Sequence, residues 1–173
     1  MRKNRVMTTR LFACVFAIIL SISHSIRADE VPLTTQIQRL TMDTALTVAQ
    51  VTIEKCRGEG VNVAVTVVDR GGDVQIILRD TLAMDLTIEI SRQKAYTAMS
   101  FNTPTSQLAD RFSSPFSVGK VKGVLMSAGG VPINAGGTII GGIGVSGAPS
   151  GETDELCAQA GLDAILDDLE MSL

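Results

Sequence analysis

Glycine is concentrated in one short stretch, and this stretch constrains the fold more than any other feature of the chain. Residues 129–147 contain eight of the sixteen glycines, and Pro149 and the acidic pair Asp154-Glu155 follow soon after. Glycine at this density indicates a backbone that adopts dihedral angles closed to other residues, or that approaches another group very closely. Two structures meet that description. One is a nucleotide-binding loop, and the other is a strand whose missing side chains leave room for a packed helix or a flat ligand.

The first 28 residues have the layout of a secretory signal peptide. Basic residues precede an unbroken apolar run at Leu11–Leu20, which is too short to span a bilayer comfortably, and small residues follow at Ser23, Ser25 and Ala28. We predict cleavage after Ala28, with Ser25 as the second choice, and a periplasmic or secreted mature protein. The alternative is a retained membrane anchor.

Removing residues 1–28 changes the chemistry that remains in the single domain expected over 29–173. The leader holds five of the fifteen Lys and Arg residues and none of the eighteen acids, so ten basic and eighteen acidic residues remain and the net charge is −8. Such an acidic chain is a poor partner for nucleic acid or anionic lipid. The only histidine, His24, also lies in the leader. Its loss argues against a Ser-His-Asp triad, a histidine zinc site and histidine-ligated haem.

Cys56 and Cys157 are the cysteines that remain after residue 28. In an oxidising compartment such a pair can form a disulfide. The enclosed loop of about 100 residues would contribute roughly 4.7 kcal/mol at most in the chain-entropy model. The alternative is two buried free thiols.

Apolar periodicity and turn residues predict an α+β domain with the order α-β-β-α-α-β-β-β-α. Helices are expected over Thr34–Arg57, from Asp85 or Thr87 to Ser100, over Thr103–Asp110, and from Thr153 or Asp154 to the C-terminus; strands are expected over Val61–Val68, Val74–Leu78, Val124–Ser127, Val131–Asn134 and Thr138–Val145. A hairpin turn at 70–73 makes the first two strands antiparallel. Strands that cluster, rather than alternate with helices, favour an antiparallel sheet throughout. The first helix has apolar residues on two sides, so we expect it to contact the sheet and also a neighbouring helix or another subunit.

The glycines of residues 142–147 match a dinucleotide-binding fingerprint only formally. They lie inside a predicted strand, and the next helix starts beyond Pro149 instead of directly after the last glycine. We therefore favour close packing against a helix or a flat ligand. The start of that next helix can hold a carboxylate or phosphate, or it can simply be capped by Thr153 and Asp154.

Four motifs, in this order, resemble the GlcG/HbpS-like family. They are V-V-D-R-G-G at 67–72, K-A-Y-T-A at 94–98, G-G-V-P-I at 129–133, and I-G-V-S-G at 143–147 followed by Asp154-Glu155. The likeness covers nearly all of residues 33–170. It implies a profilin-like domain, with an antiparallel five-stranded sheet flanked by helices, that assembles into homo-oligomers. Some members are exported and bind haem, so the resemblance also implies a tetrapyrrole ligand and a role in haem handling or redox sensing.

A haem site without histidine needs oxygen or sulfur as the iron ligand. The candidate contacts are Tyr96 as axial ligand, with Met84 and Met99 as alternatives; Phe101, Phe112 and Phe116 over a porphyrin face; and Arg79 and Lys94 as partners of the propionates. Each has an ordinary alternative, because aromatic rings usually belong to the core and charged side chains to the surface.

A second functional class is a binder of small organic acids or corrinoid-related molecules, or an enzyme accessory protein of the glycolate-operon type. Asp69, Lys94 and Asp154 can in principle supply acid–base groups. No nucleophile with an adjacent base is visible in the sequence, which favours binding over catalysis. The third possibility is a structural module that binds only a partner protein.

Overall fold

A computed structural model describes residues 31–112, 114 and 117–173. The predicted signal peptide, His24 and Phe116 lie outside the described residues. The chain divides into two units, Met1–Gln36 and Ile37–Leu173, and every element below belongs to the second unit. Within the described residues, none of the helices has the length and apolar character that crossing a bilayer requires.

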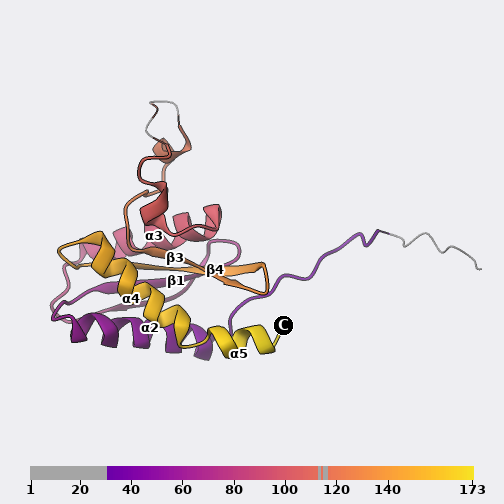
Figure 1. Ribbon diagram of the computed structural model, residues 1–173, viewed down its shortest axis with the longest axis horizontal. Helices are drawn as coiled ribbons and strands as arrows, with labels where there is room; N and C mark the ends of the chain where they lie inside the picture. Colours follow the sequence, from indigo (N-terminus) through magenta and orange to yellow (C-terminus); the bar gives the residue numbers. More distant parts are fainter. Residues whose placement is uncertain (1–30, 113, 115–116) are drawn as a thin grey trace, which may run out of the picture. The chain divides into compact units, whose positions relative to one another are not determined.

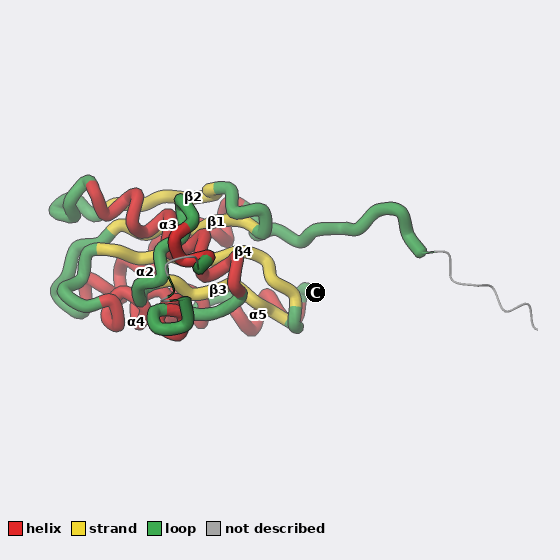
Figure 2. The backbone as a smooth tube through the Cα atoms, turned by 90° about the horizontal axis from the view of Figure 1, so that it is seen from above, coloured by secondary structure: helices red, strands yellow, loops and turns green. Residues whose placement is uncertain are grey.

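The α+β class is confirmed by an antiparallel sheet with helices on both faces (Figure 1). The strands are β1 (Ala64–Asp69), β2 (Val74–Arg79), β3 (Gly130–Ala135) and β4 (Thr138–Ser146). They lie side by side in the order β2-β1-β4-β3, as Figure 2 shows from above, and all neighbours are antiparallel. The sheet of the described residues therefore has four strands, and the prediction of five was wrong.

The strand that does not form is the one predicted at Val124–Ser127. Its backbone hydrogen-bonding groups have other partners. The Val124 N–H donates to the Val121 carbonyl at 3.1 Å, and the Leu125 N–H donates to the Thr97 hydroxyl at 2.9 Å. A turn and a helix side chain thus take the bonds that a neighbouring strand would need.

Helices cover the two faces of the sheet unequally. Helices α2 (Met42–Gly58) and α4 (Gly151–Asp163) pack together on one face, α3 (Leu86–Phe101) lies on the other, and α5 (Leu166–Met171) follows α4 (Figure 1). Two 3₁₀ turns, Thr105–Leu108 and Val118–Lys120, lie between α3 and β3. The second neighbour expected for the first helix is therefore α4.

Several predicted helix boundaries were wrong, for identifiable reasons. Helix α2 begins at Met42 instead of Thr34, because the Thr41 hydroxyl caps it by accepting the Thr44 N–H at 3.2 Å. Helix α4 is likewise capped by Ser150, not by Thr153 or Asp154. The predicted C-terminal helix ends at Asp163, and α5 restarts at Leu166. The predicted short helix at 103–110 is only the first 3₁₀ turn.

The main core lies between the sheet and the α2–α4 pair. Its members are mostly Val, Ile, Leu and Ala, among them Val48, Val65, Val67, Ile133, Ile143 and Val145. Cys56 of α2 and Cys157 of α4 are fully buried there and are joined as a disulfide, with Cα atoms 5.5 Å apart. Gly161 lets the two helices approach, because a Cβ there would lie 2.8 Å from the Val48 carbonyl oxygen. The two helices therefore form one layer.

The glycines of β4 bring α3 close to the other face. A Cβ at Gly142 would lie 2.5 Å from the Ala95 carbonyl oxygen, and one at Gly144 would collide with the Ser91 carbonyl oxygen. The Ser91 hydroxyl also bonds the Thr66 hydroxyl of β1 at 2.8 Å. Two structures were possible for the glycine stretch. Gly142 and Gly144 adopt the second of them, a strand packed closely against a helix.

Acidic side chains hold both ends of the β1–β2 hairpin. Asp69 accepts the N–H groups of Gly71 and Asp73 at 2.8 and 3.1 Å within the turn. At the other end, Asp80 accepts two hydrogen bonds from Arg57 of α2, at 2.8 and 3.1 Å. These hydrogen bonds lower the pKa of Asp80. The predicted hairpin is confirmed, and Asp69 has a structural task in it.

Candidate functional site

Lys94 of α3 and Asp154 of α4 form a buried ion pair. The Lys94 Nζ lies 2.8 Å from Asp154 Oδ2 and also donates to the Val145 carbonyl at 3.0 Å. Asp154 Oδ1 accepts the Ala148 N–H at 3.0 Å. The two side chains are 4% and 5% exposed. Both charges are therefore satisfied inside the protein, and the ammonium group is directed to Asp154 instead of to a ligand propionate.

Gly129 and Gly130 make room for this pair. Gly129 has φ +123°, and a Cβ there would lie 2.6 Å from Lys94 Nζ and 2.8 Å from Asp154 Cβ. A Cβ at Gly130 would lie 2.5 Å from the Lys94 carbonyl oxygen. Three of the four motifs noted in the sequence thus meet at one place, the junction of α3, α4 and the β3–β4 pair.

Glu155, next to Asp154, binds both ends of the connection between α3 and β3. Its carboxylate accepts the Ser106 N–H at 3.1 Å, the Ser106 hydroxyl at 2.5 Å and the Gly129 N–H at 3.2 Å. The Thr105 hydroxyl accepts the Gly130 N–H at 2.8 Å. We call these five residues the neck. Sequence reasoning assigned no role to Glu155, Thr105 or Ser106, and the only available signal was the position of Glu155 in a motif.

Residues 107–112 and 117–128, which lie along the chain between the two sides of the neck, project from the α3 side of the sheet (Figure 1). Here two of the three predicted phenylalanines meet: the ring centroids of Phe101 and Phe112 are 5.4 Å apart. The guanidinium carbon of Arg111 lies 5.9 Å from the Phe112 centroid. A Cβ at Gly119 would lie 3.1 Å from the Met126 sulfur and 3.5 Å from Phe112 Cβ. Arg111 is thus an additional neighbour of the aromatic pair, and Gly119 lies close to both Phe112 and Met126; the sequence singled out neither Arg111 nor Met126.

Tyr96 and Met99 lie elsewhere on α3. The Tyr96 ring is half-buried against the hairpin, where a Cβ at Gly72 would lie 2.7 Å from it, and Met99 is in the same small cluster. Five residues along a helix separate Tyr96 from Phe101, which places their side chains roughly 140° apart around the axis. The predicted tyrosine ligand and the aromatic pair therefore do not face one another.

Arg79 and Met84 occupy a fourth region, at the end of β2 and in the loop after it. The Arg79 guanidinium is exposed and donates to the Ala83 carbonyl at 2.6 Å, and Met84 is 62% exposed. The structure thus distributes the predicted haem contacts over the buried ion pair, the Tyr96 cluster, the Phe101–Phe112 pair and this loop. Among the described residues, Phe101 lies beside Phe112 and Met99 lies in the same cluster as Tyr96, but these two groups are separate.

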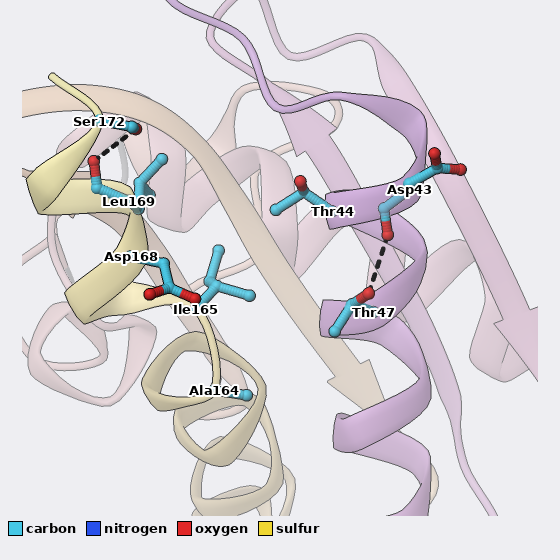
Figure 3. Close-up of a pocket in the computed structure, with 8 residues that line it drawn as sticks. All are labelled: Asp43, Thr44, Thr47, Ala164, Ile165, Asp168, Leu169 and Ser172. Carbon is cyan, nitrogen blue, oxygen red and sulfur yellow. Dashed lines mark hydrogen bonds between the residues drawn. The ribbon is translucent and has the colours of Figure 1, made fainter.

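A hollow of about 430 Å³ lies between α2 and α5 (Figure 3). Its lining residues are Asp43, Thr44, Thr47, Ala164, Ile165, Asp168, Leu169 and Ser172. Its polar groups are already partly used, because the Thr47 hydroxyl donates to the Asp43 carbonyl and the Ser172 hydroxyl to the Leu169 carbonyl. It contains no residue predicted to contact a ligand.

Comparison with known proteins establishes the family. Residues 40–163 match the model of the family described as "Haem degrading protein HbpS-like". The chain therefore belongs to the HbpS-like family, and the resemblance noted in its sequence is confirmed.

The similar proteins include one curated relative and several solved structures. An uncharacterized 15.0 kDa protein of Citrobacter freundii, from the dhaT-dhaS intergenic region, is 32% identical over 133 residues, which are 74% of this chain and 93% of that protein. The crystal structure of HbpS is 40% identical with a TM-score of 0.74, covering 77% of this chain and 94% of HbpS. The PduOC:heme complex is 26% identical with a TM-score of 0.66, covering 73% and 95%.

Proposed function

We propose that this protein binds haem or a related tetrapyrrole. The observation that carries the proposal is the likeness to PduOC, a protein of the same fold that was crystallised with heme. Membership of the HbpS-like family supports it. Bound haem would supply an iron centre able to change redox state, and this chain would supply apolar contacts, charge and an iron ligand. A role in haem handling or redox sensing, and assembly into homo-oligomers, are parts of the same proposal.

The Phe101–Phe112 pair is the described group that fits a porphyrin best. Its rings are half-buried, so they can cover a flat apolar ligand, and Arg111 beside them can bind a propionate through charge-assisted hydrogen bonds. The Met126 thioether, which like Phe112 lies close to Gly119, is a type of iron ligand found in haem proteins. Tyr96 could instead ligate the iron through its oxygen, but it lies on a different side of α3. A haem ligated by Tyr96 would therefore not lie against the Phe101–Phe112 pair.

Haem titration of the purified protein, followed by absorption spectroscopy, tests the proposal. We expect a saturable Soret band, and Phe112→Ala should weaken binding by about 0.5–1.5 kcal/mol, or roughly two- to tenfold, because one aromatic contact is lost. Met126→Leu should alter the spectrum if sulfur binds the iron, with Met171→Leu on the exposed end of α5 as control. Tyr96→Phe should alter the spectrum if the tyrosine oxygen binds the iron. No spectral change at micromolar haem would contradict the proposal.

The family description favours haem degradation as a second activity of the same site. It would appear as a progressive loss of the Soret band when a reductant is added in air to the haem-loaded protein. Free haem under the same conditions is the control, and equal decay in both samples would argue for binding alone.

We further propose that residues 1–28 direct export. The buried Cys56–Cys157 bond supports this proposal, because disulfides persist in oxidising compartments and are rare in the cytosol. A periplasmic or secreted location would also place the protein where extracellular haem is encountered.

A further inference from the structure

The connection between α3 and β3 is long, yet its two ends are held together. Connections of this length without much regular structure are uncommon in compact domains and are often functional. Here Thr105 and Ser106 on the outgoing side face Gly129 and Gly130 on the returning side. Glu155 is the one neck residue that lies outside the connection, on α4, and it bonds both sides. The geometry of the connection is therefore set from the helical scaffold.

A carboxylate is the side chain that suits the neck. Ser106 and Gly129 present three donors to Glu155, two backbone N–H groups and one hydroxyl. An ionised carboxylate offers two charged acceptor oxygens, whereas a glutamine offers one neutral acceptor oxygen for the two N–H groups and an NH₂ group that can bond only the Ser106 hydroxyl. The preceding residue, Asp154, is fixed by Lys94, so the start of α4 is anchored to α3. Glu155 thus fixes the two ends of the connection relative to α3 and α4.

The aromatic pair depends on this anchoring. Phe101 belongs to α3, whereas Phe112 belongs to the connection, so the distance between their rings depends on where the connection is held. One further tie, from the Leu125 N–H to the Thr97 hydroxyl, holds the returning side to α3. We infer that Glu155 is a positioning residue for the tetrapyrrole site, which acts by holding the neck and thereby keeping Phe112 against Phe101. This inference rests on the proposed function.

The test compares Glu155→Gln with Glu152→Gln, which removes one charge from the exposed side of the same helix turn. Of the three donors that Glu155 accepts, the Gly129 N–H is partly buried and the two Ser106 groups are exposed. A hydrogen bond in such a setting contributes about 0.5–1.5 kcal/mol, equivalent to a factor of roughly two to ten. We expect Glu155→Gln to weaken haem binding by about two- to tenfold and to accelerate hydrogen exchange of the Ser106 and Gly129 amides. Glu152→Gln should change neither quantity.

A double-mutant cycle separates positioning from a general loss of structure. If Glu155 acts through Phe112, Glu155→Gln should have little further effect on haem affinity in the Phe112→Ala background. Equal effects in both backgrounds would overturn the inference. Ser106→Ala, which removes only one donor, gives a milder second variant if Glu155→Gln does not fold, and it should show the same dependence on Phe112.

The outcomes also distinguish this inference from the proposed function. A wild-type protein with no haem spectrum would overturn both. A wild-type protein that binds haem, together with a Glu155→Gln variant of unchanged affinity, would overturn only the inference. Unchanged amide exchange at Ser106 and Gly129 in that variant would show that Glu155 does not hold the neck, and would overturn the inference as well.

Discussion

At the scale of single residues, the Lys94–Asp154 pair shows how a motif residue with a possible ligand role can serve the scaffold. Burying two charges is costly, and the cost is offset only when both find good partners. Here Lys94 also donates to the Val145 carbonyl, and Asp154 also accepts the Ala148 N–H. Gly129 leaves the space in which the ion pair fits. The residues that looked like acid–base groups therefore hold α3 and α4 in place.

Breaking this pair should be strongly destabilising. Lys94→Met leaves Asp154 buried without its cation, and we expect it to lower the free energy of unfolding by about 3–5 kcal/mol, measured by urea denaturation. Lys94→Met combined with Asp154→Leu should cost clearly less than Lys94→Met alone, since no unpaired charge remains.

The exposed pair of Lys55 and Glu59 provides the matched control. Its side chains are each 39% exposed. Lys55→Met should therefore change the free energy of unfolding by at most about 1 kcal/mol. A similar loss in Lys55→Met and Lys94→Met would contradict the assignment of Lys94 as a buried structural cation.

At the scale of elements, close helix contacts organise the two layers around the sheet. Helix α3 reaches β4 over Gly142 and Gly144, and α2 reaches α4 over Gly161. The disulfide crosses the second of these contacts and joins residues 101 positions apart in the sequence. It constrains the unfolded chain over most of the domain.

Removing the disulfide should therefore weaken the fold without changing its topology. We expect Cys56→Ala with Cys157→Ala to lower the free energy of unfolding by about 2–5 kcal/mol, because the unfolded chain gains entropy. The wild-type protein treated with a thiol reductant should lose a similar amount. Two free thiols in the exported protein, found by non-reducing mass spectrometry, would contradict the bridge.

At the scale of the whole molecule, the net charge depends on whether the first 28 residues are retained. With them the net charge is −3, and without them it is −8 by the counts given above. High net charge of one sign favours solubility and disfavours binding to surfaces of the same sign. Removal of the proposed signal peptide would therefore leave a strongly acidic protein.

Processing can be checked directly in a bacterial host with an export pathway. We expect N-terminal sequencing of the exported protein to begin at Asp29, or at Ile26 if cleavage follows Ser25, because small residues precede both sites. Ala28→Leu with Ser25→Leu should make the precursor accumulate. Recovery of unprocessed wild-type protein from the cytoplasm would contradict the prediction.

Much of the fold could be predicted from local patterns. The β1–β2 hairpin followed from the glycines at 71–72 between two apolar runs, and α3 followed from its periodicity. The Val124–Ser127 segment has the same apolar character as a strand, but its Leu125 N–H bonds to a threonine 28 residues earlier. A local pattern cannot distinguish these two environments.

The candidate site was less predictable because its contacts join distant residues. Lys94 and Asp154 are 60 positions apart, and Ser106 and Glu155 are 49 apart. The sequence identified Lys94, Asp154, Phe101 and Phe112 as notable, but not which of them would meet. The aromatic pair was expected from nearness along the chain, whereas the ion pair and the neck were not.

The amino-acid sequence by itself determined the α+β class, the antiparallel hairpin, the family, and the need for close backbone approach in the glycine stretch. These properties depend on periodicity, turn preference and residue size, which act over a few neighbouring residues. Only the tertiary structure decided that α3 packs over β4, that Lys94 is paired with Asp154, and that Glu155 holds the neck. Such choices depend on which side chains share a buried space once the layers are assembled, and that arrangement is a property of the packed domain as a whole.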